Sequence, residues 1–568
     1  MDQQRPFLYL TLFFLGFLIW STWQQEHAPK PAPGTTSTIT GTAQAPNQNQ
    51  QNSNIPAAAN IPSANTSNVN NFTQQNQNTS STSARKQIHI KTDVLDLMLD
   101  LQGGTISQVD LPTYPISLKE KDKAVRILNK EKAYSAQSGL RHQDVNGAYR
   151  SDLAPNHYAL FSAEKDQYVL AEGQNKLEVP IVWNNGKGIN VIKTLVFERG
   201  NFLVKQNTRI DNQSPTAWTG SLYMQLTHGK NTSKSSILSG GAITYTGPAY
   251  YHDKYIKVSF DDIEDETLND SVKGGWVAML QHYFVSAWIP SENTENAVYT
   301  IFDKKNENYI MGTKTPEITI NSGASDSFDS QFYVGPTDQG KLASISKGLD
   351  LTVDYGIFAF VSKPIFTAMN FIHQYVGNWG WTIILLTLLI KIIFFYPSAI
   401  SYKSMAKMKK LGPKIKEIGE KYKNDPQGKQ KATMAFYRKE KINPLGGCLP
   451  MLIQMPVFMG LYWVLQESVE LRQAPWLLWY KDLSLMDPYF VLPLLYGASM
   501  FIQQKLNPPV SQDPMQQKIF MYLPIVFTFM FLWFPSGLVL YWVVNNILTI
   551  AQQWFINKKI LGDDALKH

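Results

Sequence analysis

The chain has 568 residues, which is enough for two or more domains. Its mean hydropathy is −0.21, but residues 24–350 have the composition of a soluble protein, whereas long apolar runs dominate residues 358–556. The net charge is +7, and beside apolar runs basic residues indicate membrane topology before nucleic-acid binding. The single cysteine, Cys448, excludes an intramolecular disulfide.

Two unusual segments begin the chain. Residues 6–23 are apolar, too long for the apolar part of a cleaved signal, and not followed by a convincing small-residue cleavage site. We therefore expect residues 1–23 to form an uncleaved signal-anchor helix with a cytoplasmic N-terminus. Residues 24–84 are rich in Gln, Asn, Ser and Thr, a composition that buries too little apolar surface to become ordered, and they predict a flexible tether.

From residue 85 to about 345 the pattern alternates with a period of two. Leu95, Leu97, Leu99 and Leu101 alternate with more polar positions, as in a half-buried strand. Similar runs recur, for example TLVFERGNFLVKQNTRI, between Gly, Asn and Pro turn signals. These runs predict a large β domain, most simply a sandwich.

Residues 358–377 predict an amphipathic helix. Ile365, Met369 and Ile372 fall on one face, with Lys363 and Thr367 on the opposite face. Because an apolar span follows directly, we expect this helix to lie in the membrane interface. The alternative is a surface helix packed on the β domain.

Five further apolar segments predict transmembrane helices, six with the anchor. They cover residues 379–397, 447–467, 489–504, 518–534 and 537–556. The loop 398–446 carries 13 basic residues against four acidic ones, so it is predicted to be cytoplasmic. Counting spans from there places the β domain outside the cytoplasm and both termini in the cytoplasm.

The basic loop has helical periodicity of its own. One face of its first half is apolar, and Gly412-Pro413 is expected to kink it. A turn at residues 424–428 then separates it from a second predicted helix at 429–442. The loop therefore predicts a helical hairpin with a basic outer face.

The motifs of several enzyme classes are missing from the sequence. It contains no Walker phosphate loop and no HExxH zinc motif. None of its nine histidines lies in a predicted span, so Ser499, in a Gly-Ala-Ser stretch, lacks the base of a serine nucleophile. The five C-terminal spans have no interior Asp or Glu, which disfavours coupled transport. We expect no catalytic residue, cofactor or metal.

Polar side chains nevertheless follow a pattern inside the predicted spans. Thr387 and Lys391 are four residues apart, on one helical face. Lys391 and Gln454 both lie about 9–10 Å from the cytoplasmic end of their spans, at 1.5 Å per residue. A polar stripe runs along one face of the last span, formed by Trp542, Asn545, Thr549 and Gln552. Together these residues suggest a shared, hydrated cavity.

Each of these residues also has a simpler interpretation. Lys391 can extend its ammonium group to the lipid headgroups, and Asn or Gln can bond neighbouring helices. Met451, Met455 and Met459 form a stripe spaced by four, which suits either a surface for varied apolar partners or ordinary core packing. The pattern as a whole favours the cavity.

Eight stretches also carry a resemblance to a known family: KGGWVAMLQHYFVSAWIP (273–290), LTVDYG (351–356), VGNWGWTI (376–383), SMAKM (404–408), INPLGGCLPMLIQMPVF (442–458), ELRQAPW (470–476), DPMQQKI (513–519) and LWFPSGLVLYWVVNN (532–546). They resemble the YidC/Oxa/Alb family of membrane-protein insertases in its Gram-negative form. The likeness covers nearly the whole chain except the predicted tether.

The resemblance implies a periplasmic β-supersandwich related to sugar mutarotases, without their activity. It also implies a five-helix core, residues 378–560, around a substrate groove that is open to the cytoplasm and to lipid. The implied groove residues are Lys391, Thr387, Gln454, Tyr541, Trp542, Asn545 and Thr549. Lys391 stands where the family usually has arginine, and Tyr541-Trp542 stands where it often has two tyrosines.

The resemblance further implies a non-enzymatic insertase and chaperone for nascent membrane proteins, in contact with membrane lipids. The Sec translocon is an expected partner. The ribosome, the signal recognition particle and its receptor are candidate partners of the basic hairpin, and no direct nucleic-acid substrate is expected. Two alternatives remain open: a channel or transporter that uses the polar stripe, and a scaffold for the periplasmic domain.

Overall fold

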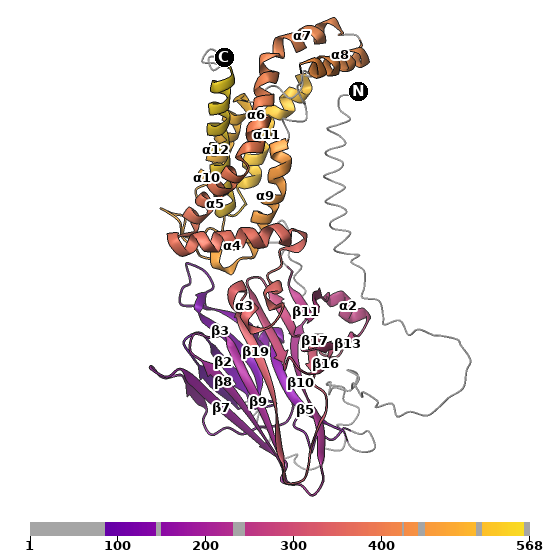
Figure 1. Cartoon of the computed structure of the whole chain (residues 1–568). Helices are drawn as coiled ribbons and strands as arrows, with labels where there is room; N and C mark the ends of the chain where they lie inside the picture. The colour runs from indigo at the N-terminus through magenta and orange to yellow at the C-terminus, as the bar shows by residue number, and fades with distance from the viewer. Residues whose placement is uncertain are drawn as a thin grey trace, which may run out of the picture.

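The computed structural model describes residues 86–143, 149–230, 245–422, 425–440, 449–506 and 514–561. The predicted signal anchor, the tether and Cys448 lie outside the described residues. The described N-terminal part is a two-sheet β domain, and the C-terminal helices stand at one end of it (Figure 1).

The β domain is a sandwich of two large sheets. The first has the order β13 (Asn269–Lys273), β16 (Glu295–Asp303), β17 (Asn308–Lys314), β10 (Trp218–Gly229), β5 (Ser135–His142), β3 (Thr105–Pro115), β2 (Asp96–Asp100), β1 (Gln87–Lys91) and β6 (Gln167–Val169), with β18 (Ile318–Ile320) beside β10 and β4 (Ala124–Asn129) beside β3. The second has the order β12 (Lys254–Lys257), β11 (Gly247–His252), β14 (Val277–Gln281), β15 (Phe284–Pro290), β19 (Ser325–Pro336), β9 (Leu203–Asn212), β8 (Ile189–Glu198) and β7 (Lys176–Asn184). The predicted β-rich sandwich is thus confirmed.

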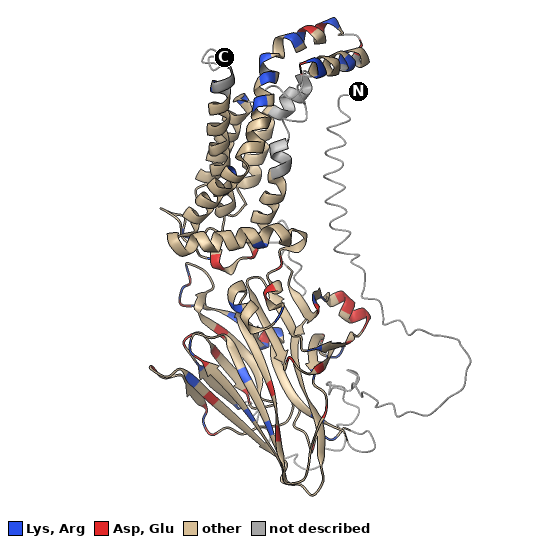
Figure 2. Ribbon diagram, viewed as in Figure 1, with Lys and Arg blue, Asp and Glu red and all other residues tan. Residues whose placement is uncertain are grey.

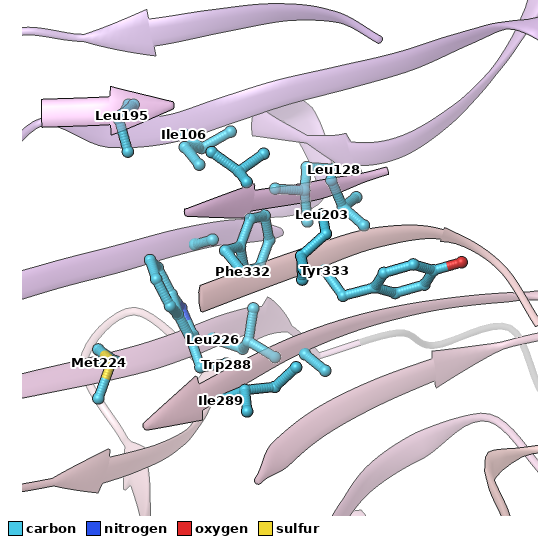
Figure 3. Close-up of a cluster of buried hydrophobic side chains, with 14 of the residues drawn as sticks. Ile106, Leu128, Leu195, Leu203, Met224, Leu226, Trp288, Ile289, Phe332 and Tyr333 are labelled. Atoms are coloured by element: carbon cyan, nitrogen blue, oxygen red, sulfur yellow. The ribbon is translucent and has the colours of Figure 1, made fainter. Parts of the chain in front are cut away.

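Alternating side chains build the core between the sheets. Every second residue of β8 is buried, as its sequence pattern requires. A four-residue connection follows, in which Gly200 has φ +69°, and it returns the chain into β9. Trp288 and Phe332 pack at the centre with rings 4.7 Å apart, among leucine and isoleucine side chains (Figure 3).

One lysine is buried inside this core. Lys193 of β8 is 1% exposed, and its Nζ donates to the backbone oxygens of Gly103 and Ser138 and to the hydroxyl of Ser138 at 2.9–3.1 Å. Burial lowers the pKa of Lys193 to about 7, because the ammonium form loses its hydration. Lys193 therefore ties the two sheets together through backbone acceptors.

The helical part consists of one transverse helix, a bundle and a distal hairpin. Its helices are α4 (Ala359–Val376), α5 (Trp379–Ile393), α6 (Phe395–Lys410), α7 (Gly412–Lys421), α8 (Pro426–Lys439), α9 (Leu449–Glu467), α10 (Val491–Leu506), α11 (Pro514–Phe531) and α12 (Ser536–Leu561). No described helix is by itself both long and apolar enough for a bilayer crossing; α5 and α6 meet that test only as a pair, which is bent by 68°. The six-span count stays a prediction.

Helix α4 occupies the segment for which the sequence predicts an amphipathic helix. It lies across the end of the bundle that faces the β domain (Figure 1). Its buried residues Ile365 and Met369 belong to the bundle core, and α4 contacts α9 and α5. Phe371 and Tyr375 on the other side are 61% and 77% exposed. The apolar face thus packs on the bundle, and aromatic side chains point outward.

Helices α7 and α8 form the predicted hairpin beyond the bundle. α7 begins at Gly412, next to Pro413, so the chain breaks there as expected. α8 begins at Pro426 rather than at residue 429, because Asp425 caps it by accepting the Gly428 N–H at 2.9 Å. Lys and Arg side chains, blue in Figure 2, are concentrated at this end of the molecule, opposite the β domain.

The loop between α9 and α10 docks on the β domain. Arg472 donates to the carbonyl oxygens of Pro115 and Ile116 at 2.7 and 3.0 Å, and Gln473 donates to Pro115 at 3.0 Å. His282 of the turn between β14 and β15 donates to the Gln466 carbonyl at 3.1 Å. The β domain therefore holds both the end of α9 and the segment that follows it.

Candidate functional site in the helical bundle

Lys391 lies near the C-terminal end of α5, facing α12. It is 7% exposed, and its Nζ donates to Thr549 Oγ1 over 2.7 Å. Thr549 is 4% exposed and donates its own hydrogen to the Asn545 carbonyl, also over 2.7 Å. Among the described residues, Lys391 forms no ion pair with an acidic side chain. The ammonium group is therefore held by a neutral oxygen.

A tyrosine on α6 completes this cluster. Tyr402 is 5% exposed, and its hydroxyl lies close to Thr549. The bend after Phe394 carries Tyr402 back against α12, and Gln552 donates to the Phe395 carbonyl at 3.3 Å. We call Lys391, Thr549 and Tyr402 the lysine cluster.

The other predicted residue of α5 behaves differently. Thr387 is 1% exposed, but its hydroxyl donates to the Ile383 carbonyl of the same helix at 2.6 Å. Its hydrogen is thus used inside α5, as is common for threonine in apolar helices. Thr387 shares a face with Lys391 without a hydrogen bond to it.

Trp542 lies among aromatic side chains from three other helices. Its ring is 4.8 Å from Phe458 of α9 and 6.0 Å from both Tyr496 of α10 and Phe531 of α11. The indole N–H is buried and has no hydrogen-bond partner among the described residues. An unpaired buried donor costs about 1–3 kcal/mol, so this N–H favours a ligand with an acceptor.

Tyr541 is 2% exposed and belongs to the apolar core of the bundle, beside Trp542. Asn545 is 6% exposed, one turn from Thr549 on the same helix. Gln454 is half-buried on α9, one turn before Phe458. Because Phe458 contacts Trp542, Gln454 lies on the part of α9 that continues toward the level of the lysine cluster.

Two further polar contacts were not predicted. Asn546 donates to Ser499 Oγ at 3.1 Å, and Ser499 donates to the Tyr496 carbonyl at 2.7 Å. These bonds join α12 to α10. Tyr402 was also missed. Its spacing of seven residues from Phe395, about two helical turns, places both on one face of α6. Among the described residues, no three His, Cys, Asp or Glu side chains are grouped to hold a metal ion.

Comparison with known proteins follows the same division of the chain. Residues 87–368 match the YidC periplasmic domain, and residues 371–563 match the family described as 60Kd inner membrane protein. The membrane protein insertase YidC of Thioalkalivibrio sulfidiphilus (strain HL-EbGR7) is 44% identical over 567 residues, with 99% of each chain covered. This chain belongs to the YidC family.

Other YidC proteins are equally similar. That of Pseudomonas fluorescens (strain SBW25) is 45% identical over 564 residues, with 99% of this chain and 98% of the relative covered. A crystal structure of an active YidC insertase with its first transmembrane domain resolved is 18% identical, with 82% and 92% of the chains covered and a TM-score of 0.36. As a YidC family member, the chain is an inner-membrane protein with a periplasmic domain.

Proposed function

We propose that the chain inserts nascent membrane proteins into the bacterial inner membrane through a hydrophilic groove around the lysine cluster. The names of its relatives support insertase activity. The observation that carries the groove is Lys391, a buried ammonium group that, among the described residues, is held by the neutral oxygen of Thr549 in a largely apolar bundle. On insertion scales a charge costs about 2.5–3.5 kcal/mol at the centre of a membrane helix and less toward its ends, so a buried charge here still favours a functional role.

The chemistry of insertion is then physical rather than covalent. A short polar segment of the incoming protein exchanges bulk water for the side chains of Lys391, Thr549 and Gln454. Acidic residues in that segment are attracted to the ammonium group. The apolar helix of the substrate moves along the lipid-exposed side of the groove into the bilayer, where its hydrophobic surface leaves water.

The proposed topology has six spans, with both termini and the α7–α8 hairpin in the cytoplasm. The basic residues at the hairpin end and the β domain at the opposite end support this orientation (Figure 2). The exposed aromatic residues of α4 suit the periplasmic membrane interface. The hairpin then receives substrates and contacts the Sec translocon, the ribosome, or the signal recognition particle and its receptor.

Replacement of Lys391 tests the groove. In a strain depleted of its own insertase, Lys391→Ala is expected to fail in growth and in insertion of a single-span substrate with acidic residues, whereas Lys391→Arg retains both. Lys505→Ala, a lysine at the end of α10, is the matched control. Full activity of the alanine variant would contradict a role for the charge.

Two further measurements separate this proposal from the open alternatives. Liposomes that contain the purified chain should not conduct ions or small solutes without a nascent substrate, as a channel would. Deletion of most of residues 85–340 should leave insertion measurable, which a scaffold for the β domain would not allow. Crosslinking from position 542 to nascent chains identifies the substrates.

A further inference from the structure

The outer face of the first sheet carries a buried polar network outside the helical bundle. Tyr223 and Tyr299 are both fully buried there, on the side of the sheet that faces away from the core residues Met224 and Leu226. Tyr223 lies over Gly139 and Tyr299 lies over Gly312, and any side chain at either glycine would collide with the tyrosine hydroxyl. Glycine on the neighbouring strand thus makes room for each ring.

Hydrogen bonds fix the direction of this network. The Tyr299 hydroxyl donates to Gln225 Oε1 at 2.9 Å, and Gln225 Nε2 donates to Gln137 Oε1 at 2.7 Å. Since both carbonyl oxygens are used in this chain of bonds, the amide orientations are set. Gln137 is therefore left to present its N–H groups outward.

A histidine provides a second donor. The Tyr223 hydroxyl accepts the backbone N–H of His157 at 3.0 Å and lies 2.6 Å from its Nδ1. The hydroxyl hydrogen then goes to Nδ1, and Nε2 carries the ring proton. Burial lowers the pKa of His157 to about 4, so the ring is neutral at pH 7.

Both donors border one cavity of about 180 Å³. Its volume equals that of about six water molecules in the liquid, at roughly 30 Å³ each. Tyr158 supplies an aromatic ring and Asp303 supplies a carboxylate, whereas none of the described residues that line the cavity is Lys or Arg. Asp303 is held in place because it accepts the Lys305 N–H and the Asn306 side-chain N–H at 3.0 and 2.7 Å.

We propose that this cavity binds a neutral, polyhydroxylated ligand of monosaccharide size, a function separate from membrane insertion. Neighbouring hydroxyl groups offer both acceptors, for Gln137 and His157, and donors, for Asp303. A ring carbon face packs on Tyr158. An apolar ligand would displace water from the N–H groups of Gln137 and His157 without replacing its hydrogen bonds, at about 1–3 kcal/mol each. An anion would meet Asp303 without a cation to balance it.

The test uses the purified full chain in lipid nanodiscs prepared without sugar detergents, because a maltoside headgroup would occupy the site. Glucose, galactose and N-acetylglucosamine are titrated and followed by saturation-transfer NMR, with gluconate and glucosamine as charged comparators. Saturable binding of at least one neutral sugar in the millimolar range or tighter is expected, with gluconate excluded.

Variants locate the site. Gln137→Ala and Asp303→Asn should each weaken sugar binding at least about tenfold, equivalent to 1.4 kcal/mol. Gln167→Ala, which removes an exposed glutamine of β6, should leave it unchanged. Unchanged near-UV circular dichroism and normal insertion by Gln137→Ala show that the protein is folded and separate this site from the proposed groove.

Three results would overturn the proposal. The first is no saturable binding of any neutral sugar. The second is equal sugar affinity of Gln137→Ala and the unmodified chain. The third is binding of an extended peptide at this cavity that the sugars do not displace.

Discussion

Lys391 and Thr549 are 158 residues apart in the chain, and their side chains meet with Nζ 2.7 Å from Oγ1. The Tyr402 hydroxyl also lies close to Thr549, so α5, α6 and α12 converge near one hydroxyl group. A single threonine therefore connects the charged residue of the bundle to the helix that leads into the basic hairpin.

Removal of the Thr549 hydroxyl should destabilise the bundle. Thr549→Val leaves the Lys391 ammonium without its acceptor, at a cost of about 1–3 kcal/mol, whereas Thr549→Ser keeps the oxygen. Thermal unfolding of the full chain in nanodiscs measures the difference. In a Lys391→Met background the valine substitution should cost much less. An equal cost in both backgrounds would contradict the coupling.

Gly380 should not tolerate a larger residue. A Cβ there would collide with the indole of Trp476, which packs against α5 from the loop between α9 and α10. Gly380→Ala is expected to cost about 1–3 kcal/mol through overpacking. The unfolding temperature of the purified chain reports this loss.

The matched control for this substitution is Gly412→Ala, where an added Cβ meets no neighbour. It should be neutral or slightly stabilising. The double substitution Gly380→Ala with Trp476→Ala should lose less stability than the two single costs added together, and strict additivity would show that the collision is not the cause.

Because of Glu470, the free energy of unfolding should decrease as pH rises from about 4.5 to 7. Burial is the main cause that raises the pKa of Glu470 to about 7, and Asp338 of the β domain adds to it. In this interval the unfolded chain has lost the proton and the folded chain retains it, so the unfolded state binds fewer protons and stability decreases as pH rises.

Glu470→Gln removes this titration. Its unfolding temperature should exceed that of the unmodified chain at pH 7.5, and the difference should shrink toward pH 5. The exposed Glu292→Gln serves as the control. A pH-independent difference for Glu470→Gln would count against the assignment.

Lys193 should have the opposite effect at alkaline pH, where the free energy of unfolding should increase as pH rises. Its pKa is about 7 in the folded protein, against about 10.4 in an unfolded chain. Between these values the unfolded state binds the extra proton, so stability rises with pH. Lys193→Met should flatten this rise in unfolding experiments, whereas the exposed Lys205→Met should not.

The sequence was sufficient for local features and insufficient for contacts between distant elements. Period-two alternation predicted the strands of the sandwich, because burial of one face of a strand directly selects the residues on it. The order of strands in each sheet depends on pairing across more than a hundred residues, which no local pattern specifies. Tyr223 over Gly139 is an example, since glycine in a strand does not reveal the ring above it.

In the candidate site, too, the sequence predicted which side chains face inward but not all of their contacts. The spacing of Lys391 on one helix and Thr549 on another predicted inward faces, and these two side chains meet. Thr387 instead bonds its own backbone, a choice that spacing does not decide. The sequence predicted Tyr402 to lie in the cytoplasmic loop. The apolar run continues through Phe394 without a helix-breaking residue, so the bend there was not foreseen.

The docked loop between α9 and α10 has a mechanical consequence. Arg472 and Gln473 fasten this loop to β3, while His282 fastens the last turn of α9. The sandwich thus offers a base for one end of the bundle. We expect any spreading of the helices to pivot about this base, with the largest displacement at the far end, where α6 leads into the basic hairpin.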